Sequence, residues 1–323
     1  MNLREIKAPI ARHMSAFEEH FSSAMQSKVP LLSTITRYIV KRKGKQMRPL
    51  FVFFAADLFS GINPRTYRAA TLIEMLQTAT LIHDDVVDDT LVRRGRSSIN
   101  ARWGNKVAVL SGDYMLSNAL ISATKTNNLQ ILKSVARIGM ELSDGELLQL
   151  INTNQTKITE EEYLKVIRKK TALLFATCTE VGALSANASL QQLEALRNYG
   201  EYLGICFQIK DDIFDYFNDI EIGKPTGNDL QDGKITLPLI YVLNNTVGTT
   251  RELILSIIEA KDYSKDNVDF IMKYAHDNGG VTYAIEKMTE YKEKAVSELS
   301  VFHNNKVKEA LVACIEFAIK RNK

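Results

Sequence analysis

The sequence predicts an all-α protein, and three observations support this prediction. Alternation of apolar and polar residues between turn dipeptides, the signal for β-strands, is scarce along the chain. Apolar residues instead recur at intervals of three and four, as in residues 163–175, which is the period of an amphipathic helix. All 6 prolines lie outside residues 65–224, so this long stretch contains no proline that would break a helix.

Turn and capping signals predict where the elements begin and end. A turn with Gly44 precedes a buried helix that begins near Pro49, and residues 61–64 form the next turn. Thr159 with Glu162 makes a capping box at the start of a later helix. The sequence predicts one or two helices before residue 40, a buried helix through residue 58, and helices over 65–91, 106–124, 128–152, 160–185, 190–218 and parts of 236–320. No low-complexity linker separates them, so we expect residues 1–323 to form a single domain.

The composition limits the kinds of protein that this chain can be. Of its 323 residues, 45% are hydrophobic and 24% are charged, which is ordinary for a globular protein with a sizeable core. The 41 Lys and Arg nearly balance the 38 Asp and Glu, and no basic stripe alternates with aromatic residues, so we expect no nucleic acid as partner. The 3 scattered cysteines argue against a disulfide framework or a zinc site and favour a reducing, cytoplasmic location. We also expect no secretory signal and no transmembrane segment.

The first candidate site lies in residues 81–89. Asp84 and Asp88 are four positions apart, so on a helix their carboxylates lie on the same face. Like charges at this spacing repel each other, and these follow an apolar run, residues 72–82, that we expect to be buried. Such a pair requires a cation. Mg²⁺ is the expected one, because it prefers oxygen ligands and is usually bound by one or two carboxylates together with water and substrate phosphate.

The same spacing occurs again in residues 207–215. Asp211 and Asp215 are four positions apart within a second apolar helical pattern. A single D-D-x-x-D motif is a weak signal, because acidic clusters are usually solvated surfaces or helix caps. Two copies, each in an apolar pattern, favour a shared metal site.

Basic and amide side chains near these motifs are candidates to bind the phosphate groups that such a metal would hold. They are Lys45, Arg48, Gln77, Arg93, Arg94, Lys170 and Gln208. Arg93 and Arg94 follow the first motif directly, and arginine is suited to paired contacts with phosphate. Each of the others, taken alone, also has an ordinary structural explanation as a solvated charge or a buried hydrogen-bonded amide. Together they describe a site for a substrate with a diphosphate head and a hydrocarbon tail.

These motifs resemble those of the trans-isoprenyl diphosphate synthases, the polyprenyl synthetase family. The resemblance covers most of the chain, and it is closest to bacterial long-chain synthases of the octaprenyl type. The matching segments are residues 44–49, 81–88, 93–95, 112–113, 145–150, 170–172, 207–215 and 237–238, and residues 223–224 with Asp229. The resemblance implies an all-α helical bundle of the isoprenoid synthase type with a central apolar tunnel.

The resemblance also implies roles for individual residues. Mg²⁺ would be bound by Asp84, Asp88 and Asp211, with support from Asp85 and Asp215. An allylic diphosphate would contact Arg93, Lys170 and Lys224, and isopentenyl diphosphate would contact Lys45, Arg48, Gln77 and Arg94. The catalytic residues would be Lys170, Thr171 and Gln208, and the oxygens of the latter two would stabilise the allylic cation. The released diphosphate would remove the proton, so the family reaction needs no protein base.

The two positions that lie one helical turn before Asp84 carry small side chains, Ala79 and Thr80. In short-chain relatives these positions often carry bulky aromatic residues, which block the growing tail. Because protein interiors are close-packed and an aromatic ring there would be a hard steric stop, the resemblance implies a product of about six to nine prenyl units. An octaprenyl chain of the kind attached to quinones is the expected product.

Several functions remain open at this point. A short-chain synthase of the geranylgeranyl type would share the motifs. A class I terpene cyclase normally has one D-D-x-x-D motif and needs no site for isopentenyl diphosphate, so Lys45, Arg48 and the second motif weigh against it. A non-catalytic subunit of a heteromeric synthase would typically have lost the aspartates, which are present here. By analogy with the family we expect a homodimer, and the apolar product leads us to expect a loose association with a membrane surface.

Overall fold

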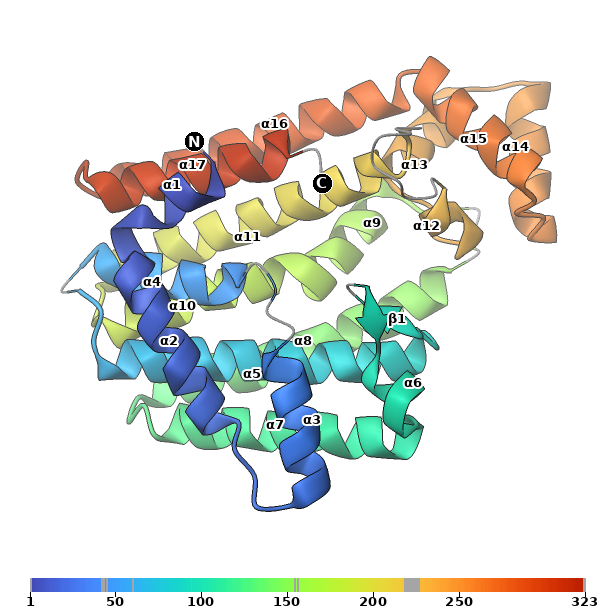
Figure 1. The fold of residues 1–323 in the computed structure, drawn as a ribbon. Helices are drawn as coiled ribbons and strands as arrows, with labels where there is room; N and C mark the ends of the chain where they lie inside the picture. The colour runs from blue at the N-terminus through green and yellow to red at the C-terminus, as the bar shows by residue number, and fades with distance from the viewer. Residues whose placement is uncertain are drawn as a thin grey trace.

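The computed structural model describes residues 2–41, 44, 46–59, 61–93, 95–153, 155, 157–217 and 227–321. These residues are helical nearly throughout, which confirms the all-α prediction (Figure 1). The α-helices are α1 (Leu3–Lys7), α2 (Ala11–Ala24), α3 (Pro30–Val40), α4 (Met47–Asp57), α5 (Pro64–Val87), α6 (Ile99–Trp103), α7 (Asn105–Thr124), α8 (Leu129–Asn152), α9 (Glu160–Ile167), α10 (Leu173–Ser185), α11 (Leu190–Phe214), α12 (Asn228–Gln231), α13 (Leu237–Asn245), α14 (Thr249–Ala260), α15 (Lys265–Asp277), α16 (Gly280–Glu298) and α17 (Lys306–Lys320). The short elements are the 3-10 segments η1 (Ala8–Ile10) and η3 (Leu299–Val301), the π-helical segment η2 (Arg168–Ala172), and the antiparallel strands β1 (Val92–Arg93) and β2 (Arg96–Ser97).

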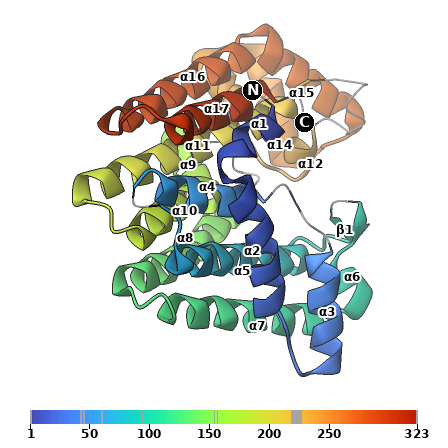
Figure 2. The same ribbon diagram turned by 60° about the vertical axis from the view of Figure 1, so that its left-hand side comes forward.

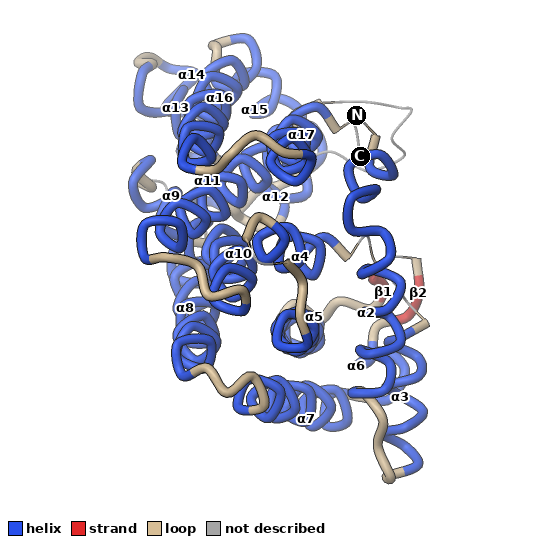
Figure 3. The backbone as a smooth tube through the Cα atoms, turned by 90° about the vertical axis from the view of Figure 1, so that its left-hand side faces the viewer, coloured by secondary structure: helices blue, strands red, loops and turns tan. Residues whose placement is uncertain are grey.

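Helix α5, which carries the first aspartate motif, is surrounded by other helices. Asn63 caps its first turn by accepting two backbone hydrogen bonds, and Pro64 occupies a position where no intrahelical N–H is needed. Helices α2, α4, α7 and α10 pack around α5, which Figure 3 shows nearly end-on. Its buried apolar residues are Leu72, Ile73, Met75, Leu76, Ala79 and Ile82. They lie on several sides of the helix rather than along one stripe, and this confirms that the run over 72–82 is buried.

Helix α11 carries the second aspartate motif at its C-terminal end and packs closely on α10 and α16 (Figure 1). It also packs on η2. Two glycines allow the close approach. A Cβ added at Gly204 would lie 2.5 Å from the Cα of Ala172, and one at Gly200 would lie 2.7 Å from the carbonyl oxygen of Phe175. Since these separations are too short for a real side chain, any larger residue would push α11 away from its neighbours.

The two ends of the chain lie near each other. Helix α1 packs on α17, and α17 packs on α11 and α16, so both termini are on the same side of the molecule (Figure 2). This arrangement brings Arg321, which follows α17 directly, to the helix that carries the second aspartate motif. Among the described residues, none of the helices has the length and apolar character needed to cross a membrane.

Several elements differ from those that the sequence predicted, and the helix expected over 190–218 ends at Phe214. The helix expected over 160–185 is divided into α9, η2 and α10 by a π-helical turn. The segment between the helices expected over 65–91 and 106–124 contains the short strands β1 and β2 and helix α6. The first aspartate helix ends at Val87 rather than near residue 91, because Asp88 is its C-cap and Asp89 has a left-handed φ of 47°. The capping box of Thr159 with Glu162 at the start of α9 is confirmed.

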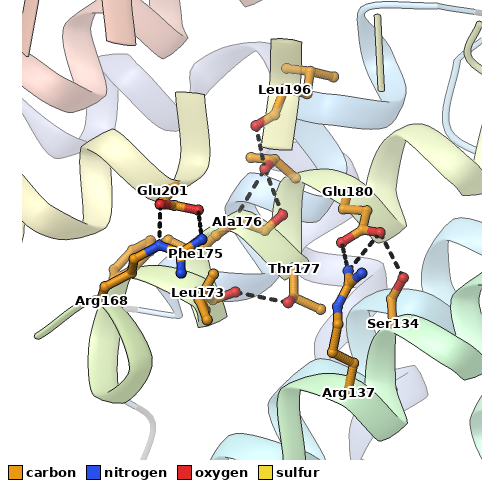
Figure 4. Close-up of polar contacts among 11 residues, drawn as sticks. Ser134, Arg137, Arg168, Leu173, Phe175, Ala176, Thr177, Glu180, Leu196 and Glu201 are labelled. Carbon is orange, nitrogen blue, oxygen red and sulfur yellow. Dashed lines mark hydrogen bonds and ion pairs between the residues drawn. The ribbon is translucent and has the colours of Figure 1, made fainter. Parts of the chain in front are cut away.

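A buried carboxylate joins α10 to α8 (Figure 4). Glu180 of α10 is only 8% exposed. Nη2 of Arg137 donates to its two oxygens at 3.0 and 2.8 Å, and Oγ of Ser134 donates at 2.8 Å. A buried carboxylate is costly unless it is paired and hydrogen-bonded, so these contacts stabilise the α8–α10 interface.

We expect Arg137→Met to lower the free energy of unfolding by about 1–3 kcal/mol, because Glu180 would remain buried without its charged partner. The Arg137 side chain is 46% exposed, and solvent screening keeps the loss below that of a fully buried pair. Urea unfolding followed by circular dichroism measures the change. The double variant Arg137→Met with Glu180→Met should lose less than the sum of the single variants, and additive losses would contradict a coupled pair.

Candidate active site

The first aspartate motif lies where α5 ends. The backbone N–H of Asp88 donates to the carbonyl oxygen of Asp84 at 2.8 Å, and the Asp84 side chain is half-buried whereas Asp88 is exposed. Burial, and then the negative charge of Glu146, raise the pKa of Asp84 to about 6, while the cation of Lys170 acts in the opposite direction. The charged form of Asp84 is therefore disfavoured, and a divalent cation bound here would offset that penalty.

Asp85, the next residue, faces another side of α5. It is 3% exposed, and its Oδ1 accepts a hydrogen bond from Nε of Arg93 at 2.5 Å. Its backbone carbonyl also accepts from Nδ2 of Asn100 at 2.9 Å. These bonds fasten the segment after α5 to the helix, and they hold the Arg93 guanidinium beside the first motif.

The second aspartate motif lies at the end of α11. Asp211 is partly exposed, and its Oδ1 accepts from Nη2 of Arg321 at 2.7 Å. Both oxygens of Asp215 accept from the start of α12, Oδ1 from the backbone N–H of Asn228 at 3.0 Å and Oδ2 from that of Asp229 at 2.9 Å. Asp215 therefore fixes the beginning of α12 next to the motif.

Asp212, next to Asp211 in the second motif, is buried inside the protein. It is 4% exposed, and it accepts hydrogen bonds from Oη of Tyr163 at 2.6 Å and from Nε2 of Gln208 at 2.8 Å. Burial and then the charge of Asp229 raise the pKa of Asp212, and the bonds from Tyr163 and Gln208 act in the opposite direction. The Asp212 carboxyl group thus holds the side chains of Tyr163 and Gln208 in place.

The segment η2 presents Lys170 and Thr171 between α8 and α11. Nζ of Lys170 lies 2.8 Å from Oε1 of Glu146 and 3.1 Å from Oε1 of Gln149, and Oγ1 of Thr171 donates to Oε1 of Gln208 at 2.8 Å. A Cβ at Gly145 of α8 would lie 2.8 Å from the backbone N of Lys170, so only glycine permits this approach. A π-helical turn inserts an additional residue, which redirects the side chains that follow it, and such turns occur frequently at functional sites.

A cavity of about 660 Å³ brings together several of the predicted phosphate-binding residues. Arg48, Gln77 and Arg93 line it, and so do the apolar rings of Phe175 and Phe207. Gln77 is 8% exposed, and the Arg48 guanidinium carbon lies 5.8 Å from the centre of the Phe175 ring. The cavity therefore combines cationic groups with an apolar wall.

A second cavity, of about 200 Å³, contains the predicted catalytic residues Lys170, Thr171 and Gln208. Arg93 and Lys170 were expected to share one diphosphate, but they line different cavities. Three further predicted residues, Lys45, Arg94 and Lys224, lie outside the described part of the chain.

Sequence reasoning missed two basic residues at the site. Arg321 lines the larger cavity, and its guanidinium carbon lies 4.0 Å from the centre of the Phe207 ring. Lys234 lines the smaller cavity. Burial acts to lower the pKa of Lys234, but the hydrogen bond to Asp232 and the charges of nearby aspartates, Asp88 included, raise it overall. Lys234 follows soon after Asp229, which belongs to one of the segments that resemble the family, and this closeness could have identified it from the sequence. No such segment surrounds Arg321.

The two predicted chain-length residues lie on different sides of α5. Ala79 is 1% exposed and lies one helical turn before His83. Because Nε2 of His83 lies 3.2 Å from the carbonyl oxygen of Val109 in α7, Ala79 is on the side of α5 that faces α7. Thr80 is one turn from Asp84 and is partly buried, so it lies directly below the carboxylate of the first motif.

Comparison with known proteins places these residues in a family. The family model for polyprenyl synthetase matches residues 29–275. An all-trans-nonaprenyl-diphosphate synthase (geranyl-diphosphate specific) from Rhodobacter capsulatus is 36% identical over 98% of this chain and 98% of its own length. The octaprenyl diphosphate synthase of Escherichia coli is 33% identical over 100% of both chains.

Solved structures agree with this fold. A polyprenyl synthase from Caulobacter crescentus, in complex with calcium and isoprenyl diphosphate, has a TM-score of 0.91 and 31% identity over 100% of this chain and 98% of that chain. A geranylgeranyl pyrophosphate synthase from Bacteroides thetaiotaomicron has a TM-score of 0.84 and 39% identity over 98% of this chain and 99% of that chain. The fold, the two aspartate motifs and the matches over nearly the whole chain lead to one conclusion: the protein belongs to the polyprenyl synthetase family of prenyltransferases.

Proposed function

We propose that this chain, as one polyprenyl synthetase domain, elongates an allylic diphosphate head to tail with isopentenyl diphosphate. Farnesyl diphosphate is the expected primer, and an all-trans octaprenyl diphosphate for quinone side chains is the expected product. One observation carries the proposal: the acidic ends of α5 and α11 lie beside Lys170 and the cationic cavity. The octaprenyl synthase relative supports the product length.

We propose that Mg²⁺ is held by Asp84, Asp88 and Asp211. The raised pKa of Asp84 fits this role, since a carboxylate among other carboxylates binds a cation readily. Asp85 and Asp215 support the site through Arg93 and α12, to which their oxygens are hydrogen-bonded. When bound, the metal supplies charge neutralisation to the departing diphosphate. The relative whose structure contains calcium and isoprenyl diphosphate supports the use of a divalent metal.

We propose that isopentenyl diphosphate binds in the larger cavity. Arg48 and Gln77 line it and would contact the diphosphate together with Lys45 and Arg94, and Arg93 and Arg321 extend the cationic wall. Phe175 and Phe207 provide apolar contact for the five-carbon tail. The allylic diphosphate would contact Lys170, with Arg93, Lys224 and Lys234 completing its cationic surroundings.

In this assignment Thr171 and Gln208 face the carbon from which the allylic diphosphate departs. Their oxygens stabilise the positive charge that develops there, and fixed dipoles of this kind are worth more in a dry site than in water. The double bond of isopentenyl diphosphate attacks that carbon, and the departed diphosphate takes the proton. Lys170, on the same segment as Thr171, holds the diphosphate near its point of departure.

We propose a homodimer in a reducing cytoplasm, in loose association with a membrane surface that accepts the apolar product. One face of α7 supports the dimer, because large apolar side chains are exposed along it. They are Val109 (40%), Leu110 (68%), Leu116 (36%), Leu120 (42%) and Ile121 (50%). A monomeric mass by light scattering would contradict the dimer, and failure to sediment with lipid vesicles would contradict the association with membranes.

A shorter product is the second candidate. The structural relative that is 39% identical is a geranylgeranyl synthase, so identity alone does not separate long-chain from short-chain activity. A class I terpene cyclase and a non-catalytic subunit fit less well, because both aspartate motifs and the cationic cavity are present.

Purified protein incubated with farnesyl diphosphate, labelled isopentenyl diphosphate and Mg²⁺ should give a ladder of products ending at about eight prenyl units, because the two positions one turn before Asp84 carry the small side chains Ala79 and Thr80. Chromatography of the dephosphorylated products measures their lengths. Termination at geranylgeranyl would retain the elongation reaction and reject the long-chain product. No incorporation would refute the proposed function.

We expect Thr80→Phe to shorten the product more than Ala79→Phe does, because Thr80 lies directly below Asp84 whereas Ala79 lies toward α7. The same product ladder measures both variants. Leu190→Phe, at an exposed position in the first turn of α11, is a control that should leave product length unchanged. Unchanged product lengths in both α5 variants would reject this account of chain-length control.

Arg321→Ala should raise the KM for isopentenyl diphosphate at least about tenfold, because a charge-assisted hydrogen bond to phosphate is lost. Because Arg321 also donates to Asp211, a proposed metal ligand, the KM for the allylic diphosphate should rise as well, but by a smaller factor. Steady-state kinetics with each substrate varied in turn measures the difference. Arg65→Ala, at the opposite end of α5, is the matched control and should leave both values unchanged. An equal rise in both KM values would argue against a separate isopentenyl site.

A further inference from the structure

Three side-chain hydrogen bonds form a chain where α9, η2 and α11 meet. Oη of Tyr163 donates to Oδ2 of Asp212 at 2.6 Å. Nε2 of Gln208 donates to Oδ1 of Asp212 at 2.8 Å, and Oγ1 of Thr171 donates to Oε1 of Gln208 at 2.8 Å. The chain thus runs from a tyrosine on α9, through a buried carboxylate, to the two residues whose oxygens are assigned to the allylic cation.

The hydrogen bonds run in one direction along this chain. The two oxygens of Asp212 accept one bond each, Oδ2 from the hydroxyl of Tyr163 and Oδ1 from the NH₂ group of Gln208. The amide oxygen of Gln208 then faces away from Asp212, toward Thr171. The Thr171 hydroxyl uses its single hydrogen on that oxygen, which leaves lone pairs on both residues and no free hydroxyl hydrogen.

These residues line the cavity of about 200 Å³ that also contains Lys170. A turned amide would place the NH₂ hydrogens of Gln208 beside Thr171, and their partial positive charge would oppose a developing cation. The orientation of one amide therefore decides whether this part of the wall stabilises or destabilises positive charge on carbon.

We propose that Tyr163 is a positioning residue: through Asp212 it fixes the Gln208 amide with its oxygen toward Thr171 and the reacting carbon. The proposal rests on the proposed function, because it concerns the cation formed in that reaction. Tyr163 engages Oδ2 of Asp212, and this leaves Oδ1 directed at Gln208. Without the hydroxyl, the carboxylate and the amide could both rotate.

The position of the Tyr163 hydroxyl is itself fixed. The side chain is 5% exposed, and it lies in the first turn of α9, which the capping box of Thr159 and Glu162 holds in place. The bidentate ion pair of Arg168 with Glu201, at 2.5 and 3.2 Å, fastens the start of η2 to α11 (Figure 4). The tyrosine is therefore part of a rigid frame that includes both Thr171 and Gln208.

The test is Tyr163→Phe, which keeps the ring and removes only the hydroxyl. Its matched control is Tyr199→Phe: Tyr199 is 0% exposed, belongs to α11 like Gln208, and donates to the carbonyl oxygen of Leu311 at 2.8 Å, away from both cavities. Both variants should lose similar thermal stability. Single-turnover and steady-state kinetics with farnesyl and isopentenyl diphosphate measure the effect. For Tyr163→Phe we expect a kcat about tenfold lower than that of the wild type, with both KM values within about twofold of the wild type. For Tyr199→Phe we expect an unchanged kcat.

A double-variant cycle separates positioning from general destabilisation. If Tyr163 acts through Gln208, removing the Tyr163 hydroxyl should not lower kcat further once Gln208 is replaced. The double variant Tyr163→Phe with Gln208→Leu should therefore have the same kcat as the single variant Gln208→Leu. The same fold loss in both backgrounds would overturn the proposal, and so would an unchanged kcat in Tyr163→Phe or an equal loss in Tyr199→Phe. A wild-type protein without elongation activity would refute the proposed function instead.

Discussion

Repulsion between carboxylates at the ends of α5 and α11 is the constraint around which this site is arranged. Asp84 shares its surroundings with Glu146 and Asp88, and the second motif faces Asp229. Such a concentration of negative charge is stable only if cations lie close by. Basic side chains from four separate parts of the chain provide them: Arg93, Lys170, Lys234 and Arg321. The remaining negative charge is what a divalent metal would balance.

In each aspartate motif, neighbouring carboxylates have different surroundings. Successive residues on a helix point about 100° apart, so one carboxylate faces the site while the next faces the protein. In the first motif the inner carboxylate, Asp85, holds Arg93, and in the second Asp212 holds Tyr163 and Gln208. The inner aspartates therefore hold Arg93, Tyr163 and Gln208 in place, whereas the outer aspartates are the ones that we propose to bind the metal.

Close backbone contacts complete the site. Gly145 and Gly204 bring α8 and α11 against η2 from two sides, and the π-helical turn then directs Lys170 toward α8 and Thr171 toward α11. Relatives of similar identity are named as nonaprenyl, octaprenyl and geranylgeranyl synthases, so the shared fold does not by itself fix the length of the product.

Spacing along the chain was enough to predict the helical class, the buried run over 72–82, the capping box at Thr159 and the two pairs of aspartates, because each depends on residues within one helix. Contacts between distant segments, in contrast, could be found only in the folded molecule. Arg321 reaches Asp211 across 110 positions, and η2 departs from the α-helical pattern where two glycines of other helices press on it. Local periodicity contains no information about such pairings, since they are fixed by packing of the whole chain.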